Sequence, residues 1–443
     1  MNQFGRISLI PVGFVLFLIQ IGMADNPLIL DQFTADPTAR VFEGKIYVYP
    51  SHDIPVPPGS GARPNWFCME DYHVFSSENL TDWTDHGVIL TQSEVPWLTR
   101  MSYNMWAPDC VFRDGKYYFY FPTGGGIGAA IADNPYGPFK PEPTSIRGIR
   151  GIDPGVIIDK DGSAYLFYSD LMVAKLKENM VEIEGRPQQI ANLPRKGLRE
   201  GPFPFERNGI YYLTYPHVQN NTERLEYATA SSPMGPYEWK GVIMDESASG
   251  CWTNHHSILE YKGQWYLFYH DMDLSPKFDK NRAIKADYLY FNEDGTIKKV
   301  IPTVRGIGNA PATNKIQIDR YSAKSETGAA VEYLNPEKTF DGWKTVLSAP
   351  DAWIRYDRVD FAGKTVKTLK VRAMSATGGS IEVQIGKDDA AIKVPVVIAE
   401  STDWTMASSN VRVAPSVVPS GLQDIKVVLK GGDKVEIDWI QFE

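Results

Sequence analysis

The sequence predicts an all-β protein, a five-bladed β-propeller followed by a β-sandwich (jelly-roll) domain. A Gly–Tyr pair that recurs five times predicts the propeller, and the alternating strands that follow residue 302 predict the sandwich. An aromatic content of 12%, with 23 Tyr and 11 Trp among 443 residues, also favours β structure.

The repeat is a glycine followed three residues later by a tyrosine that opens an alternating aromatic run, as in Tyr47-Val48-Tyr49. Such a unit is typical of a hairpin turn that leads into a half-buried strand. The pairs are Gly44/Tyr47, Gly115/Tyr118, Gly162/Tyr165, Gly209/Tyr212 and Gly263/Tyr266. Their spacings of 71, 47, 47 and 54 residues fit one four-stranded blade per copy.

The chain divides into four predicted segments. Residues 1–24 are expected to be a signal peptide, because Arg6 precedes an apolar run and Gly22-Met23-Ala24 offers small residues for cleavage. An uncleaved anchor is the alternative. Residues 25–302 are expected to form the propeller, 303–314 a linker and 315–443 the sandwich. A secreted or periplasmic protein is therefore expected, without a membrane span in the mature chain.

The net charge of −9 and the lack of a basic run argue against nucleic-acid binding. The three cysteines, Cys68, Cys110 and Cys251, leave their pairing open, and no Cys/His zinc spacing is present. No organic cofactor is expected, and the protein is expected to be a monomer.

The first strand of a propeller blade lines the central channel, so equivalent positions of the blades converge on one axis. Each repeat glycine follows an ionisable residue by six to nine positions, and these residues are Asp36, Asp109, Asp153, Glu200 and His255. Gathered carboxylates repel one another, and burial adds to the effect, so at least one pKa should rise. A protonated carboxyl beside an ionised one is what glycoside cleavage requires. For any single Asp-Pro, such as Asp36-Pro37, a turn opening is the alternative.

Three further residues are candidates on weaker grounds. His255 could hold a cation or water on the axis, or be a hydrogen-bonded structural group. Trp106 could stack on a sugar ring or belong to the propeller packing. Arg282 could contact substrate or pair with an acid of the channel. The loop of residues 55–65 is expected to wall the pocket.

At these residues the chain resembles glycoside hydrolase family 43. The resemblance covers about residues 26–302 and rests on the stretches NPLILDQFTADPTARVFEGKIYVY, MWAPDCVFRDGKYYFYF, GIDPGVIIDKDGSAYLFY, REGPFPFERNGIYYLTY and TNHHSILEYKGQWYLFYHD. It implies a five-bladed propeller and inversion, with Asp36 as general base, Glu200 as general acid and Asp153 as the residue that orients Glu200 and raises its pKa. It further implies that His255 lies near a central calcium ion and that Arg282 contacts the sugar, although Asn254 departs from the family's usual glycine.

The C-terminal part resembles a family 6 carbohydrate-binding module through IQIDRYSA, WIRYDRVDF, TGGSIEVQI and KGGDKVEIDWIQF. The resemblance implies a stacking role for Trp404 and a structural calcium ion near Asp319 and Asp438. Glu436 stands where such modules commonly have a ligand-contacting Asn, which argues against sugar binding by that cleft. A purely structural sandwich is the alternative.

The resemblance implies an exo-acting glycosidase that releases terminal arabinofuranose or xylose from plant polysaccharides or oligosaccharides. A β-galactofuranosidase or galactosidase on the same scaffold is an alternative within the enzyme class. A non-catalytic glycan-binding propeller is the alternative outside it. Fructan hydrolases share five blades and three acids, but their Asn-Asp-Pro-Asn and Glu-Cys motifs are missing here.

Overall fold

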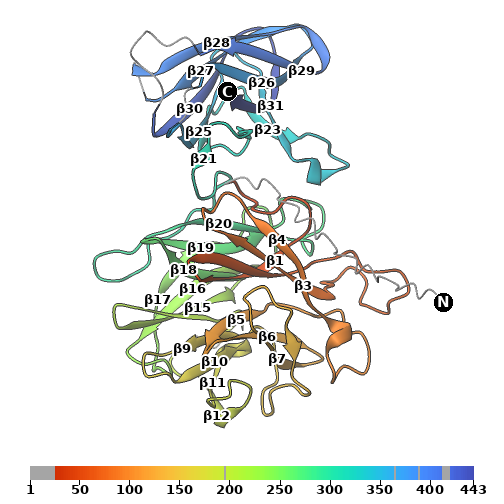
Figure 1. Ribbon diagram of the computed structural model, residues 1–443, viewed down its shortest axis with the longest axis vertical. Coiled ribbons are helices and arrows are strands. Elements are labelled where there is room, and N and C mark those ends of the chain that lie inside the picture. Colours follow the sequence, from red (N-terminus) through yellow and green to blue (C-terminus); the bar gives the residue numbers. More distant parts are fainter. Residues whose placement is uncertain (1–24, 194–195, 364–365, 388–389, 412–419) are drawn as a thin grey trace, which may run out of the picture.

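The structure is a computed structural model that describes residues 25–193, 196–363, 366–387, 390–411 and 420–443. The predicted signal peptide, residues 1–24, lies outside the described residues. The described chain forms two bodies of β-strands, the larger N-terminal one below and the smaller C-terminal one above in Figure 1. No helix of the described residues is long and apolar enough to cross a membrane.

The lower body is a propeller whose five sheets are antiparallel and arranged in chain order. The first sheet holds β1 (Ala35–Phe42), β2 (Lys45–Ser51), β3 (Asp71–Ser77) and β4 (Thr84–Thr91). The second holds β5 (Asp109–Arg113), β6 (Lys116–Thr123), β7 (Gly126–Ala132) and β8 (Lys140–Pro141). The third holds β9 (Gly155–Ile158), β10 (Ala164–Tyr168), β11 (Met172–Leu176) and β12 (Ile183–Gln189). The fourth holds β13 (Leu198–Arg199), β14 (Phe203–Arg207), β15 (Ile210–Val218), β16 (Glu223–Ala230) and β17 (Glu238–Met244). The fifth holds β18 (His256–Tyr261), β19 (Gln264–Asp271) and β20 (Ala283–Leu289).

The blades close into a ring around their innermost strands. Successive contacts join β1 to β5, β5 to β9, β9 to β14, β14 to β18, and β18 back to β1. The N-terminal segment lies along β20, because the Leu28 N–H donates to the Ile284 carbonyl and the Thr34 N–H to the Arg282 carbonyl, each at 2.9 Å. Residues from the start of the propeller thus complete its last blade.

The recurring Gly–Tyr pair is a hairpin turn in every blade. Four of the glycines follow a residue that also has positive φ, as at Glu43-Gly44 (52° and 77°) and Asn208-Gly209 (54° and 82°), which is the type I′ geometry that matches strand twist. The third turn differs: only Gly162 has positive φ, and the Gly162 N–H donates to the Asp159 carbonyl at 2.9 Å. The tyrosines that follow lie on the second strand of each hairpin, where Tyr212 is fully buried.

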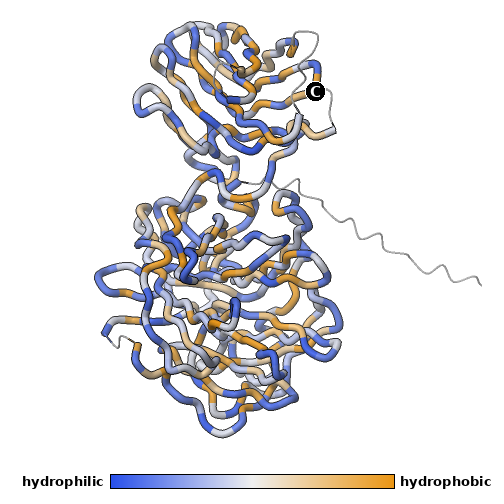
Figure 2. The backbone as a smooth tube through the Cα atoms, turned by 90° about the vertical axis from the view of Figure 1, so that its left-hand side faces the viewer, coloured by the Kyte–Doolittle hydropathy of each residue, from blue (hydrophilic) through white to orange (hydrophobic). Residues whose placement is uncertain are grey.

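The upper body is a sandwich of two sheets. One sheet holds β21 (Ala310–Pro311), β22 (Ala323–Lys324), β25 (Trp353–Asp360), β27 (Gly379–Ile385), β28 (Ile392–Ile398) and β30 (Leu422–Gly431). The other holds β23 (Ala329–Tyr333), β24 (Trp343–Leu347), β26 (Thr368–Ser375), β29 (Ser401–Asn410) and β31 (Val435–Phe442). Apolar and polar residues alternate along these strands (Figure 2), and the inward set forms one core that includes Val371, Val383 and Ile437.

The two bodies are joined by more than the covalent chain. The Asp25 carboxylate accepts hydrogen bonds from the Tyr356 hydroxyl at 2.7 Å and from the Arg305 guanidinium at 3.3 Å. Within the predicted linker, the Thr303 N–H donates to Asp287 of the propeller at 3.0 Å, whereas Ala310 pairs in parallel with Val359 of the sandwich. The residues between the two bodies are therefore packed against both.

Candidate active site

Three equivalent backbone positions, each directly before a proline, build one end of the central channel. Asp36, Asp153 and Gly201 have φ values of 47°, 58° and 51°, in the left-handed region that non-glycine residues seldom occupy. Glycine is required at 201, because an added Cβ would lie 2.9 Å from the His255 ring. The same local conformation thus recurs in three blades, with Glu200 one residue ahead of the position that Asp36 and Asp153 occupy.

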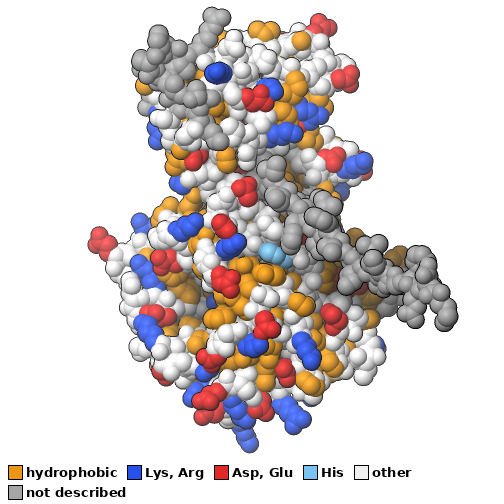
Figure 3. Space-filling view, viewed as in Figure 1, with side chains coloured by type: hydrophobic (Ala, Val, Ile, Leu, Met, Phe, Trp, Pro, Cys, Tyr) orange, Lys and Arg blue, Asp and Glu red, His pale blue; other side chains and the backbone are white. Residues whose placement is uncertain are grey.

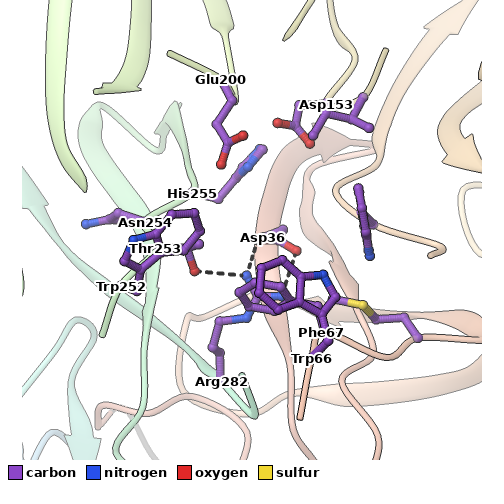
Figure 4. Close-up of a pocket in the computed structure, with 13 residues that line it drawn as sticks. Asp36, Trp66, Phe67, Asp153, Glu200, Trp252, Thr253, Asn254, His255 and Arg282 are labelled. Atoms are coloured by element: carbon purple, nitrogen blue, oxygen red, sulfur yellow. Dashed lines mark hydrogen bonds and ion pairs between the residues drawn. The ribbon is translucent and has the colours of Figure 1, made fainter. Parts of the chain in front are cut away.

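A pocket with about 580 Å³ of empty space, including its open mouth, lies at this end of the channel (Figure 4). Its lining contains six of the seven residues that the sequence places around the channel: Asp36, Trp106, Asp153, Glu200, His255 and Arg282. Other lining residues are Trp66, Phe67, Met69, Ile152, Trp252, Thr253 and Asn254. Residues from all five blades therefore meet around one hollow.

Asp36 is held as an ionised carboxylate. Its two oxygens accept hydrogen bonds from Arg282 Nη1 at 2.7 Å and Nη2 at 3.1 Å, and the Ser51 hydroxyl also donates to it. Its backbone N–H donates to His270 Nδ1 at 3.0 Å. Burial raises the pKa of Asp36, but the charges of Arg282, His270 and His255 outweigh burial and lower the pKa to about 2.

Arg282 is fixed between two acids, and each of its guanidinium nitrogens donates a hydrogen bond. Nε donates to Asp53 at 2.9 Å, Nη1 to Asp36 and to Thr253 at 3.3 Å, and Nη2 to both aspartates. Its guanidinium also lies 4.7 Å from the centre of the Phe67 ring. Arg282 lines the pocket and at the same time pairs with an acid of the channel, so its clearest effect is to orient Asp36.

The pKa values of Asp153 and Glu200 are raised, whereas that of Asp36 is lowered. Burial raises the pKa of Glu200, and the negative charge of Asp36 adds to this effect. Burial and the charges of Glu200 and Asp36 raise the pKa of Asp153 well above its ordinary value. Figure 4 shows the carboxyl groups of both residues turned toward the space around His255. One pocket thus holds a carboxylate with a lowered pKa beside two carboxyl groups whose pKa values are raised.

A further buried acid, Glu223, stands behind Glu200 and does not follow the repeat that predicts the others. It is 1% exposed at the start of β16, and its carboxylate accepts a hydrogen bond from the Asn254 N–H. Burial and the neighbouring Glu200 raise the pKa of Glu223 well above its ordinary value. Asp53 is a second acid that the sequence analysis missed, because neither residue lies at the repeated distance from a glycine.

Asp109, in contrast, does not line the pocket, although the sequence places it in phase with the other acids. It lies at the start of β5, where Arg40 Nη2 donates to it at 2.6 Å and the Val156 N–H at 2.6 Å. This carboxylate is 0% exposed and joins neighbouring blades. Its blade contributes Trp106 to the pocket instead.

His255 lies directly before β18 and is a neutral imidazole. Burial, with the nearby Arg282, lowers the pKa of His255 to about 4, against the opposing effect of Asp36. A neutral ring can offer a lone pair to a cation, but Ca²⁺ prefers six to eight oxygen ligands. Asp36, the carboxylate whose charge acts on His255, already accepts hydrogen bonds from Arg282 and Ser51. The described residues therefore fit a calcium ion only if His255 holds it and water supplies most of its ligands.

Aromatic rings wall the pocket. Trp66 and Phe67 make an edge contact with ring centres 5.3 Å apart, and Phe67 lies 6.4 Å from Trp252. The buried indole N–H of Trp106 has no hydrogen-bond partner among the described residues. No residue of the loop 55–65, which the sequence predicts as a wall, lines the pocket, and the wall is formed instead from Trp66 onward. Trp252 adjoins the Thr-Asn-His stretch in the sequence, which is the signal that could have identified it.

The sandwich carries a second, more polar hollow, with about 900 Å³ of empty space including its mouth. It is lined by Lys315, Gln317, Leu334, Asn335, Asp341, Arg372, Trp404, Asp438 and Trp439. Glu436 is not among these residues, because Lys344 and Lys434 pair with it at 2.6 and 2.5 Å. The glutamate thus does not obstruct the hollow. Asp438 pairs with Arg372, and one oxygen of Asp319 pairs with Arg320, whereas the buried Oδ2 of Asp319 has no hydrogen-bond partner among the described residues.

The three cysteines are buried and free, which answers the question of their pairing.

Residues 24–297 match the model of glycosyl hydrolases family 43, and residues 311–443 match that of the family 6 carbohydrate-binding module. The chain belongs to glycosyl hydrolase family 43. It is accordingly a glycosidase that hydrolyses O-glycosyl bonds, with a C-terminal family 6 module. A purely glycan-binding propeller is thereby excluded.

Similar proteins agree with this assignment. A "Xylosidase/arabinosidase 43A" of Humicola insolens is 35% identical over 61% of this chain and 98% of the relative. An "Arabinoxylan arabinofuranohydrolase" of Paenibacillus polymyxa is 26% identical over 96% of this chain and 75% of the relative. Among solved structures, a family 43 β-xylosidase/α-arabinofuranosidase from a compost microbial metagenome, in a calcium-free complex with xylotriose, has a TM-score of 0.56. It is 34% identical and covers 63% of this chain and 98% of its own.

Proposed function

We propose that this family 43 glycosidase is an exo-acting, inverting enzyme that releases terminal xylose or arabinofuranose from plant polysaccharides or oligosaccharides. The observation that carries the proposal is the contrast between Asp36, with a pKa of about 2, and the raised pKa values of Glu200 and Asp153 in one pocket. The choice of pentose rests on the names of the similar proteins, which include xylosidases and an arabinofuranohydrolase.

In the proposed reaction, Asp36 is the general base. Its ionised carboxylate orients a water molecule and takes a proton from it as the water attacks the anomeric carbon. Arg282 and Ser51 keep the carboxylate in one position, which lowers the entropic cost of this step. Because Arg282 stabilises the negative charge, Asp36 accepts the proton only as positive charge develops on the water.

Glu200 is the proposed general acid, which donates its proton to the leaving glycosidic oxygen. Asp153 is proposed to act through Glu200. Mutual repulsion between the two buried carboxyl groups helps a proton to remain in the pair. After the bond breaks, Asp36 carries the proton of the water and Glu200 is ionised, and exchange with solvent restores the starting state. Trp106 and Arg282 remain proposed substrate contacts.

Two further proposals concern the surroundings of the enzyme. Calcium is proposed to bind at His255, where it would add positive charge to the channel, and a second ion is proposed near Asp319 and Asp438 in the sandwich. Secretion or export to the periplasm is proposed from the charged, apolar and small-residue segments of residues 1–24. Sequencing the N-terminus of the exported protein would test the export proposal, and metal analysis before and after chelation would test the calcium proposal.

The decisive experiment measures the first sugar released by the purified full chain. The panel contains aryl xyloside, aryl arabinofuranoside, aryl galactofuranoside and arabinoxylan, and proton NMR follows the anomer formed before mutarotation. Release of the inverted pentose supports the proposal. A retained anomer would contradict inversion, and preference for galactofuranoside would favour the alternative specificity.

A further inference from the structure

Two histidines and an aspartate converge on the first blade, outside the catalytic pocket. His52, Asp71 and His73 each offer one ligand atom, and these atoms all lie within 4.8 Å of one another. None of the three lines the pocket. Figure 3 shows Lys, Arg, Asp and Glu side chains scattered over this face of the propeller, with a small histidine surface close to the sandwich.

The register of β2 and β3 places these side chains, and His52 is the residue that directly follows β2. Asp71 and His73 are two residues apart on β3 and point to the same face. Ser51 of β2 pairs with Tyr72, and the next residue, His52, therefore comes opposite Asp71. The sequence could not reveal this group, because His52 and His73 are 21 positions apart, one directly after β2 and the other on β3.

Each imidazole is oriented by a carboxylate. His52 Nδ1 lies 2.7 Å from an Asp71 oxygen, and His73 Nδ1 lies 3.1 and 3.2 Å from the two Asp85 oxygens. At His73, the ring nitrogen that donates to Asp85 carries the proton, which leaves Nε2 with its lone pair. This carboxylate–histidine arrangement is the usual support of a metal-binding histidine. At His52, Nδ1 already faces Asp71, and an ion would replace the proton that these two groups share.

The surroundings are negatively charged and partly shielded from water. The carboxylates of Asp85, Asp71 and Asp31 all lie close enough to His73 to interact with its charge. Asp85 is itself fixed, since Gln32 donates to it at 3.1 Å and the Gly87 N–H at 2.7 Å. The side chains of His52, Asp71 and His73 are 21%, 15% and 15% exposed, so an ion can reach them.

We propose that His52, Asp71 and His73 bind one Zn²⁺ ion. Two imidazoles and one carboxylate are ligands that zinc prefers, and three protein ligands leave the fourth tetrahedral position for water. Ligand atoms around tetrahedral zinc are roughly 3.3 Å apart, given bonds of about 2.0–2.1 Å. Modest rotation of the three side chains would bring their ligand atoms, which now lie within 4.8 Å of one another, to this separation.

The ion would tie together strands that also support the catalytic base. His52 lies between Ser51 and Asp53, whose side chains contact Asp36 and Arg282 respectively. Zinc on the opposite side of this segment has no access to the sugar. We therefore expect it to stabilise the first blade rather than to take part in the reaction.

The test is zinc titration of the tag-free full chain by calorimetry, with thermal unfolding as a second readout. Wild-type protein should bind one Zn²⁺ with a rise in Tm. His52→Ala and the nearly isosteric Asp71→Asn should each weaken affinity at least tenfold, and Asp85→Asn about tenfold through loss of orientation. His86→Ala is the matched control, since its ring stacks on Tyr136 and lies outside the group.

Asp36→Asn separates this site from the catalytic pocket and should leave zinc affinity unchanged. The proposal is wrong if wild-type protein takes up no zinc, or if zinc affinity is the same in wild type and Asp71→Asn. It is also wrong if zinc affinity falls in Asp36→Asn instead. In each of those cases the three residues form only a hydrogen-bonded group.

Discussion

The propeller pocket and the sandwich hollow both combine aromatic rings with carboxylates, but they differ in how far positive side chains balance these carboxylates. In the propeller, Asp36, Asp153 and Glu200 are crowded into a buried space with one guanidinium, Arg282. In the sandwich, Asp438 pairs with Arg372, and Lys315 lies 4.8 Å from the centre of the Trp439 ring. The propeller therefore holds more carboxyl groups than it can neutralise, whereas the sandwich charges are matched.

This difference separates a site suited to proton transfer from a hollow whose charges are already paired. Uncompensated burial spreads the pKa values of neighbouring carboxyl groups, which is how one group becomes an acid and another a base. Charges that are matched at a surface pair with one another and leave flat rings to contact a ligand. The comparison predicts that substitutions in the propeller change rate, and that substitutions in the sandwich change retention on polysaccharide.

The largest effect is expected for Glu200→Gln. Loss of the general acid should lower kcat on xylo-oligosaccharides by about 10²–10⁴-fold. The loss should be much smaller for aryl glycosides with good leaving groups, because these need less protonation. Steady-state kinetics on both substrate types checks this. Glu206→Gln, on the nearby β14 and paired with Lys160, is the control. Equal losses on the two substrate types would contradict an acid role.

A large effect on pH dependence is expected for Arg282→Lys. Arg282 lowers the pKa of Asp36 to about 2, and lysine cannot reproduce the bidentate contact. Asp36 must be ionised to act as a base, so a higher pKa moves the acidic limb of kcat/KM upward, by about one pH unit for each 1.4 kcal/mol of lost interaction. A pH–rate profile measures this shift. An unmoved acidic limb, in a variant with normal Tm, would show that Asp36 does not depend on Arg282.

A moderate effect on stability is expected for Glu223→Gln. The folded state raises the pKa of Glu223, so the group favours folding fully below its unfolded pKa, and that contribution is lost as pH rises through the folded pKa. Glutamine is neutral throughout. Between pH 5 and 8, wild-type Tm should therefore fall relative to that of the variant. Thermal unfolding across this range checks the prediction, which fails if the two curves run parallel. Activity should fall less than tenfold, because glutamine retains the acceptor for the Asn254 N–H.

The smallest effect on catalysis is expected for Trp404→Ala. Removal of this ring from the sandwich hollow should weaken binding to insoluble arabinoxylan about tenfold, since an aromatic contact contributes about 0.5–1.5 kcal/mol beyond its buried area. Hydrolysis of small aryl glycosides should stay within twofold of wild type. Pull-down and kinetic assays measure the two effects separately. Trp353→Ala, on the other sheet beneath Lys426, is the control. Unchanged binding would favour a purely structural sandwich.

Local sequence signals were sufficient to predict the propeller and three of the acids in its pocket. Glycine adopts positive φ readily, so Glu43-Gly44 and its counterparts favour tight hairpin turns. The number of these repeated turns predicts the number of blades. Asp36 and Asp153 precede prolines at equivalent positions, so a local count brings them to one channel. The same count also includes Asp109, which the structure removes from the pocket by pairing it with Arg40.

Only the tertiary structure decided which charges face one another. Asp53, Glu223 and His270 have no spacing that marks them, and each acquires its role through a neighbour more than 20 residues away. The sequence by itself determined the turns, the strands and the chemical types brought to the hub, since these depend on local backbone preference and alternation. Burial and the distances between charges arise only when the ring closes, and they determine which carboxyl group keeps its proton.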